Sequence, residues 1–81
     1  YTVSTERRYS MLNNTIPRIC IAACRVNAGL SQREFAEKIG VSLATITNWE
    51  SGKTEPDLSE LRAISNLSGI PMDFIFVQRE S

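Results

Sequence analysis

The sequence contains no histidine and only two cysteines among its 81 residues. Cys20 and Cys24 lie one helical turn apart, and two thiols are too few for a structural zinc site without further ligands. We interpret both as packing residues in a reducing compartment. The sequence also lacks a nucleophile–base motif and a glycine-rich phosphate loop. These absences argue against an enzyme and predict no cofactor and no metal site.

Long apolar runs and an excess of one charge are missing too. No stretch approaches the roughly 18 apolar residues of a membrane span, and no signal peptide is visible, so we expect a cytoplasmic protein without a membrane partner. Nine Lys and Arg residues balance nine Asp and Glu residues. This balance counts against a generic nucleic-acid binder, whose affinity usually comes with a basic surplus. Phosphate contacts would then depend on helix N-termini and a few placed cations.

Residues 30–53 carry the signals of two short helices joined by a tight turn. Ser31 is a good N-cap, and Glu34 three residues later completes a capping box. Gly40 is placed to end the first helix, since glycine readily adopts a positive φ. Ser42 is a new N-cap for the second helix. The spacing therefore predicts a helix-turn-helix.

The second helix, over about residues 42–51, has a thin apolar side and an unusual opposite face. Ile46 and Trp49 form the apolar side, so we interpret Trp49 as a packing residue. The other face carries Leu43, Ala44, Thr45, Thr47, Asn48 and Ser51. Base edges in the DNA major groove require short donors and acceptors, and an apolar group for the thymine methyl. A threonine-rich surface helix is the alternative, but the preceding capped helix and glycine turn favour DNA binding.

Four segments carry a resemblance to a known family: residues 29–32 (GLSQ), 35–42 (FAEKIGVS), 46–53 (ITNWESGK) and 67–73 (LSGIPMD). With them, the chain resembles the helix-turn-helix domain of lambdoid phage repressors and Cro proteins, the xenobiotic-response-element type of regulator. The resemblance implies an all-α fold, a compact five-helix bundle of the lambda-repressor-like DNA-binding type, with the helix-turn-helix formed by helices 2 and 3. It also implies a transcriptional regulator, most simply a phage or prophage repressor, that binds a double-stranded DNA operator as a homodimer.

The resemblance and the side-chain chemistry together nominate site residues. The expected base contacts are Leu43, Ala44, Thr47 and Asn48. The expected phosphate contacts are Gln32, Ser42, Thr45, Ser51, Lys53 and Thr54. Leu43 and Ala44 depart from the family pattern, since many relatives carry glutamine there, and they favour contact with thymine methyls. Asn48 is then the best polar reader, because an amide matches the donor and acceptor edge of adenine.

The resemblance also implies an ion pair and a dimer interface. In related repressors an arginine of the first helix pairs with a glutamate at the end of the recognition helix, here Arg25 and Glu50. The alternative is two unrelated surface charges. The last helix makes the twofold contact in those repressors, so Met72 and Phe74 are the expected interface residues. Alternatively, Phe74 and Phe76 simply cover the core.

Three further helices complete the expected bundle. The first covers about residues 17–28. The fourth has a capping box of Asp57 and Glu60 and ends at Gly69, and the short fifth covers about residues 71–77. The expected inward-facing residues are Ile21, Cys24 and Ala28 in the first helix, and Leu58, Leu61, Ile64 and Leu67 in the fourth.

The two ends of the chain fall outside this bundle, which we place at residues 15–78. Residues 1–14 show no helical period, so we expect a flexible or non-native arm. The alternative is an arm whose Arg7 and Arg8 reach a minor groove. Residues 79–81 are expected to be a tail. Because the first residue is not methionine, we expect a fragment or a processed chain.

Two other functions remain open at this point. An antitoxin of a toxin–antitoxin pair shares this fold and also binds a toxin protein. A protein-interaction module could keep the fold after losing DNA binding, and the neutral charge and the Leu43–Ala44 pair leave room for it.

Overall fold

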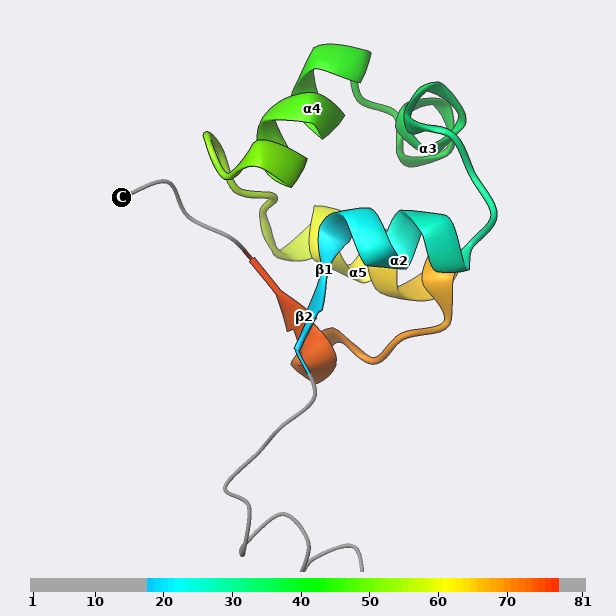
Figure 1. The fold of residues 1–81 in the computed structure, drawn as a ribbon, viewed down its shortest axis with the longest axis vertical. Helices are drawn as coiled ribbons and strands as arrows, with labels where there is room; N and C mark the ends of the chain where they lie inside the picture. Colours follow the sequence, from blue (N-terminus) through cyan, green and yellow to red (C-terminus); the bar gives the residue numbers. More distant parts are fainter. Residues whose placement is uncertain (1–17, 78–81) are drawn as a thin grey trace, which may run out of the picture.

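The computed structural model describes residues 18–77. In chain order its elements are β1 (Ile19–Cys20), α2 (Ile21–Asn27), α3 (Gln32–Ile39), α4 (Leu43–Ser51), α5 (Leu58–Ser68), the 3-10 helix η1 (Met72–Phe74) and β2 (Ile75–Phe76). α3 and α4 lie together at one end of the domain, α2 packs on α5 in the middle, and the two strands lie at the other end (Figure 1). None of the described helices is long and apolar enough to cross a membrane.

Local capping chemistry sets the helix boundaries. Ser31 Oγ accepts a hydrogen bond from the Glu34 amide at 3.1 Å, and the Glu34 carboxylate accepts one from the Ser31 amide at 2.8 Å. Gly40 ends α3 with a φ of 92°, a conformation that is strained for residues with a Cβ. Ser42 caps α4, and Asp57 starts α5 with a second capping box. The predicted boundaries of these three helices are confirmed.

The core forms where the four α-helices face one another. Its members are Ile21, Cys24, Phe35, Ala36, Ile46, Trp49 and Ile64. Phe35, Ile46 and Ile64 come from three different helices, and none of them has exposed surface. The prediction that Leu58 faces inward is wrong, because this side chain is 62% exposed. Leu58 is the first residue of α5, and the packed part of the stripe begins one turn later, at Leu61.

The predicted five-helix count is also wrong, since the described chain has four α-helices. The first begins at Ile21 and not near Pro17, which lies outside the described residues. Residues 71–77 form η1 and β2 in place of a fifth α-helix. The expected arm with Arg7 and Arg8 and the expected tail also lie outside the described residues.

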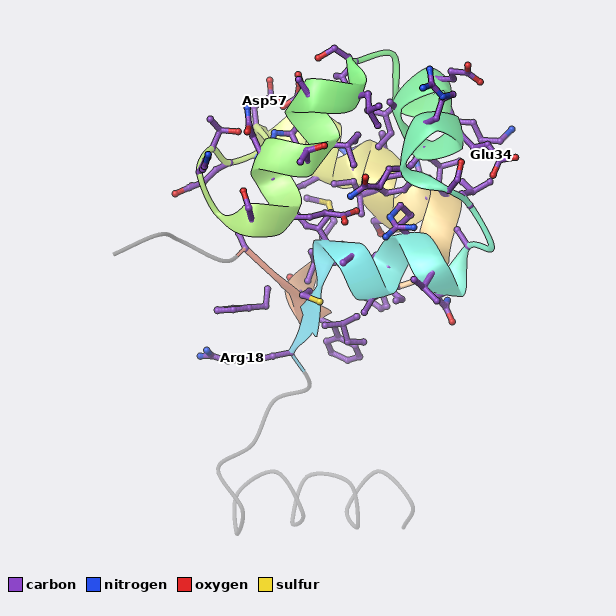
Figure 2. All side chains as sticks on the ribbon, turned by 45° about the horizontal axis from the view of Figure 1, so that its top comes forward. Arg18, Glu34 and Asp57 are labelled. Carbon is purple, nitrogen blue, oxygen red and sulfur yellow. The ribbon has the colours of Figure 1, made fainter. Side chains whose placement is uncertain are left out.

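A short parallel strand pair, β1 and β2, stands where helical turns were expected before Ile21 and after Phe74. Ile19 pairs with Ile75 and Cys20 with Phe76. β-branched and aromatic side chains favour strands, but the two partners are far apart in the sequence, so no local pattern reveals their pairing. The Arg18 guanidinium lies 5.3 Å from the centre of the Phe76 ring, a cation–π distance. Figure 2 shows Arg18 at this end of the domain, away from the labelled Glu34 and Asp57.

The different burial of Ile64 and Leu58 predicts different effects of their substitution on stability. Ile64→Ala should lower the free energy of unfolding by about 2–5 kcal/mol, because it leaves a cavity in the packed core. Leu58→Ala, on the same helix, should cost less than about 0.5 kcal/mol, since most of that side chain is already in water. Urea unfolding followed by circular dichroism measures both. Equal losses for the two variants would contradict this description of the core.

Candidate nucleic-acid interface

α4 has one side in the core and the opposite side in solvent. Ile46 and Trp49 anchor it, with 0% and 2% of their surfaces exposed. We call the opposite side the recognition face; its residues are Leu43, Ala44, Thr47, Asn48 and Ser51. Asn48 is half-buried and the other four residues are exposed. The four predicted base contacts thus share one face of one helix.

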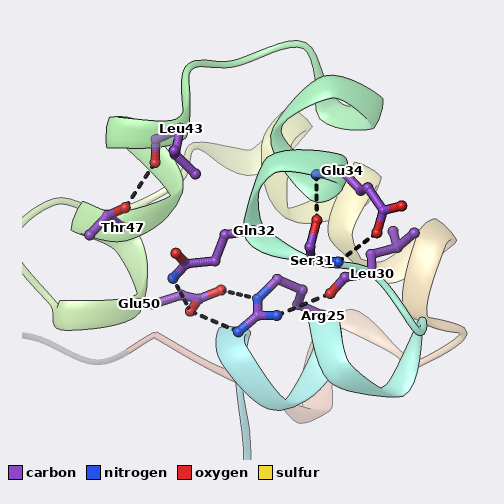
Figure 3. A network of polar contacts seen from close by, with 8 residues as sticks. All are labelled: Arg25, Leu30, Ser31, Gln32, Glu34, Leu43, Thr47 and Glu50. Atoms are coloured by element: carbon purple, nitrogen blue, oxygen red, sulfur yellow. Dashed lines mark hydrogen bonds and ion pairs between the residues drawn. The ribbon is translucent and has the colours of Figure 1, made fainter.

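The C-terminal end of α4 is tied to the other helices through Glu50. Arg25 Nε donates to Glu50 Oε2 at 2.7 Å, and Arg25 Nη2 donates to Oε1 at 3.4 Å. Gln32 Nε2 donates to Glu50 Oε1 at 2.9 Å, and Arg25 Nη1 donates to the Leu30 carbonyl at 3.0 Å. Figure 3 shows these groups meeting between α2, α3 and α4. The pair that the resemblance implied is therefore present, and its side chains are only 18% and 10% exposed.

Helix electrostatics explain why Glu50 needs these partners. A carboxylate in the last turn of a helix faces the negative end of the helix dipole. The Arg25 guanidinium offsets this repulsion through a two-point contact that the single ammonium of a lysine cannot reproduce. Gln32, at the start of α3, adds a donor from the other helix of the helix-turn-helix. One carboxylate consequently links α2, α3 and α4.

Several predicted phosphate contacts already form hydrogen bonds within the domain. The hydroxyl oxygens of Ser42 and Thr45 lie 2.9 Å apart and share a hydrogen bond. Ser51 Oγ donates to the Asn48 carbonyl at 3.2 Å. The Gln32 amide retains one N–H after donating to Glu50, because an amide nitrogen carries two protons.

The loop after α4 holds the remaining predicted phosphate contacts, Lys53 and Thr54, in exposed positions. The Lys53 and Thr54 amides both donate to the Asn48 carbonyl, at 2.9 and 3.4 Å. The loop therefore folds back onto the end of α4. Gly52 makes this return possible with a φ of 86°.

The predicted dimer contacts lie elsewhere. Met72 and Phe74 belong to η1, at the strand end of the domain, and both are half-buried.

Cys24 lies in the core, where burial raises the pKa of its thiol above the ordinary value and so disfavours the thiolate. Residues 18–77 contain no group of three or more His, Cys, Asp or Glu side chains able to hold a metal ion.

One polar contact behind the helix-turn-helix has no signal in the sequence. Asn27 Nδ2 donates to the Ser68 carbonyl at 2.8 Å and joins the ends of α2 and α5. Ser68 is only 7% exposed, and its hydroxyl donates to the Ile64 carbonyl at 2.7 Å. It also accepts from the Ile70 amide at 3.2 Å. A serine before a helix-ending glycine gives no signal of this role in the sequence. Only the packing of α2 on α5 brings Ser68 into contact with Asn27.

A capped helix, a glycine turn and a second helix with an exposed uncharged face define a helix-turn-helix protein. The family model for the helix-turn-helix matches residues 21–75. The chain belongs to this family, in its lambda repressor and Cro type.

The chain is also similar to several bacterial transcriptional regulators. It is 38% identical over 52 residues to the SPbeta prophage-derived HTH-type regulator YonR of Bacillus subtilis, covering 64% of this chain and 48% of that protein. It is 32% identical over 56 residues to the regulator ImmR of Bacillus subtilis, covering 69% and 44%. It is 37% identical over 49 residues to the transcriptional activator BcrR of Enterococcus faecalis, covering 60% and 24%. The chain thus spans at most about half of each relative. No solved structure matches it.

The Glu50 contacts predict a strong energetic coupling. Arg25→Ala and Glu50→Ala should each lower the free energy of unfolding by up to about 3–5 kcal/mol, because each leaves a partly buried charge unpaired. The double variant should lose less than the sum of the two. Urea unfolding measures all three, and Arg33→Ala, at an exposed arginine of α3, is the control. Strictly additive losses would show that the pair contributes nothing as a pair.

The capping box predicts a pH dependence. The Ser31 amide and hydroxyl hold the pKa of the Glu34 carboxyl below its ordinary value, so the stabilisation is present above about pH 4.3, the unfolded pKa. It is lost as the pH falls through the folded pKa. The stability difference between wild type and Glu34→Gln should therefore shrink from pH 6 to pH 3, measured by thermal unfolding.

Glu37→Gln is the control for this experiment, since it removes one negative charge from the same helix outside the box. A Glu34→Gln difference that stays constant over this pH range would exclude a stabilising role for the ionised carboxylate.

Proposed function

We propose that this domain binds double-stranded DNA in a sequence-specific manner as part of a transcriptional regulator, with α4 in the major groove. One observation carries the proposal. Glu50 is the only charged residue of α4, and the hydrogen bonds from Arg25 and Gln32 keep it off the recognition face. The face that remains is small, uncharged and able to approach base edges closely.

Asn48 is the proposed polar reader of this face. No hydrogen bond is found for its side-chain amide among the described residues, although its backbone carbonyl accepts four. The amide is thus free to donate and accept at once, which matches the N6 and N7 positions of adenine. Leu43 and Ala44 provide apolar contacts for thymine methyls. Similarity to named transcriptional regulators supports the same function.

Because the charges of the chain balance, we expect a few individual groups to bind DNA phosphates in place of a broad basic surface. With nine basic and nine acidic residues, the chain has no overall field that attracts DNA. We propose that Lys53, Thr54 and the free N–H of Gln32 contact phosphates from the two ends of the helix-turn-helix. Such placed contacts fix the register of α4 in the groove and leave sequence reading to the recognition face.

We also propose that the protein acts as a homodimer on a twofold operator, as a phage or prophage repressor. The similarity to the prophage-derived YonR supports the phage origin. Met72 and Phe74 are the proposed interface residues, because η1 carries them away from the recognition face and leaves both half-buried. Two recognition helices would then lie about 34–36 Å apart, one turn of DNA.

Selection from a randomised duplex pool, followed by sequencing of the retained DNA, tests this function. The wild type should enrich a twofold symmetric motif. Asn48→Ala should lose information at one base pair in each half-site and bind the wild-type motif roughly 5–100-fold more weakly. Asn66→Ala, at an exposed asparagine of α5, is the matched control and should behave as wild type.

Two other results would redirect the proposal. An enriched motif without twofold symmetry would overturn the dimer. No enriched motif from the wild type would favour a protein-interaction module, for which the exposed Leu43 offers a contact.

A further inference from the structure

The hydroxyl group of Thr47 is polarised by its own helix. Thr47 Oγ1 lies 3.0 Å from the Leu43 carbonyl oxygen, one turn earlier in α4 (Figure 3). A carbonyl only accepts, so the hydroxyl must be the donor. A hydroxyl has a single proton and two lone pairs. With that proton engaged, the oxygen offers only acceptor capacity to anything outside the helix.

The position of Thr47 makes this polarity relevant. Thr47 is exposed and occupies the middle of the recognition face, one turn from both Leu43 and Ser51. When a recognition helix enters the major groove, the residues of its N-terminal part contact base edges, and Thr47 lies one turn after Leu43 on the same face. Phosphate oxygens are acceptors themselves, and they would be poor partners for an oxygen that has no proton to give.

We propose that Thr47 selects the adenine of an A·T base pair by accepting a hydrogen bond from its N6 amino group. This inference rests on the proposed binding of DNA by α4. In the major groove only the adenine N6 and cytosine N4 amino groups donate. Guanine and thymine at that position would present acceptors to the Thr47 oxygen, which leaves both groups without a partner.

The apolar neighbours of Thr47 distinguish adenine from cytosine. On the thymine side of the adenine amino group, an A·T pair displays the thymine O4 and then the thymine methyl, so Leu43 and Ala44 gain an apolar contact with the same base pair. A C·G pair displays the guanine N7 acceptor in place of that methyl. Leu43, of which 37% is exposed, has no polar group with which to satisfy this acceptor. Specificity at this position therefore combines one acceptor with an apolar surface.

The first part of the test compares motifs from the randomised pool for wild type, Thr47→Val and Thr47→Ser. Valine has the shape of threonine without the oxygen, so Thr47→Val should lose the preference at one A·T pair per half-site. Serine keeps the hydroxyl, and Thr47→Ser should keep that preference. Thermal unfolding should show both variants folded, since Thr47 is exposed and its hydroxyl bond is local to α4.

The second part uses the selected operator with base analogues at the identified position. Replacing adenine by purine, which lacks the N6 amino group, should weaken wild-type binding roughly fivefold. The same replacement should leave the affinity of Thr47→Val unchanged. Replacing the paired thymine by uracil, which lacks the methyl, should weaken both proteins.

Three outcomes would overturn the inference. Thr47→Val could retain the wild-type motif, the position that it alters could be a G·C pair, or wild-type binding could be indifferent to the purine replacement. If any of these accompanies a motif that depends on Asn48, only the role of Thr47 fails and DNA binding stands. Without an enriched motif from the wild type, both fail together.

Discussion

The orientation of α4 depends on one partly buried carboxylate, that of Glu50. A glutamate at the end of a helix is unfavourable by itself, since it faces the negative end of the dipole and loses water on burial. Arg25 from α2 and Gln32 from α3 offset this cost with three hydrogen bonds to the carboxylate. Glu50 thereby connects α2, α3 and α4. The same hydrogen bonds hold the carboxylate of Glu50, the only charged group of α4, away from the exposed face of the helix. The contacts that link α4 to α2 and α3 therefore also leave its exposed face without a charge.

The uncharged recognition face and the zero net charge of the chain limit the sources of free energy for binding DNA. A strongly basic domain gains affinity from counterion release at any DNA sequence. We propose that this contribution is small here and that affinity arises from close fit and from hydrogen bonds of the correct polarity. The internal bonds of Ser42, Thr45, Thr47 and Ser51 are relevant for this reason, since Thr47 and Ser51 donate their hydroxyl protons within α4, and Ser42 and Thr45 share one hydrogen bond.

The opposite end of the domain is organised by the β1–β2 pair. This pair brings the two ends of the described chain side by side and sets where α2 begins (Figure 1). The cation–π contact of Arg18 with Phe76 lies on the same pair. Because η1 directly precedes β2, the proposed interface residues Met72 and Phe74 are held by the strand pairing and by α5. The two proposed surfaces thus rest on separate parts of the fold.

The sequence by itself determined the helix-turn-helix and the face that α4 exposes. Its signals are local: Ser31 with Glu34, the positive φ of Gly40, the Ser42 cap, and the spacing of Ile46 and Trp49 each act within one or two turns. The partner of Arg25 could be named only through the family resemblance, and the Leu30 carbonyl that completes its contacts could not be named at all. Tertiary structure alone decided the pairing of Ile19 with Ile75 and the exposure of Leu58, which periodicity assigned to the core. These features depend on which segments meet in space, and a pattern that extends over a few residues carries no information about that.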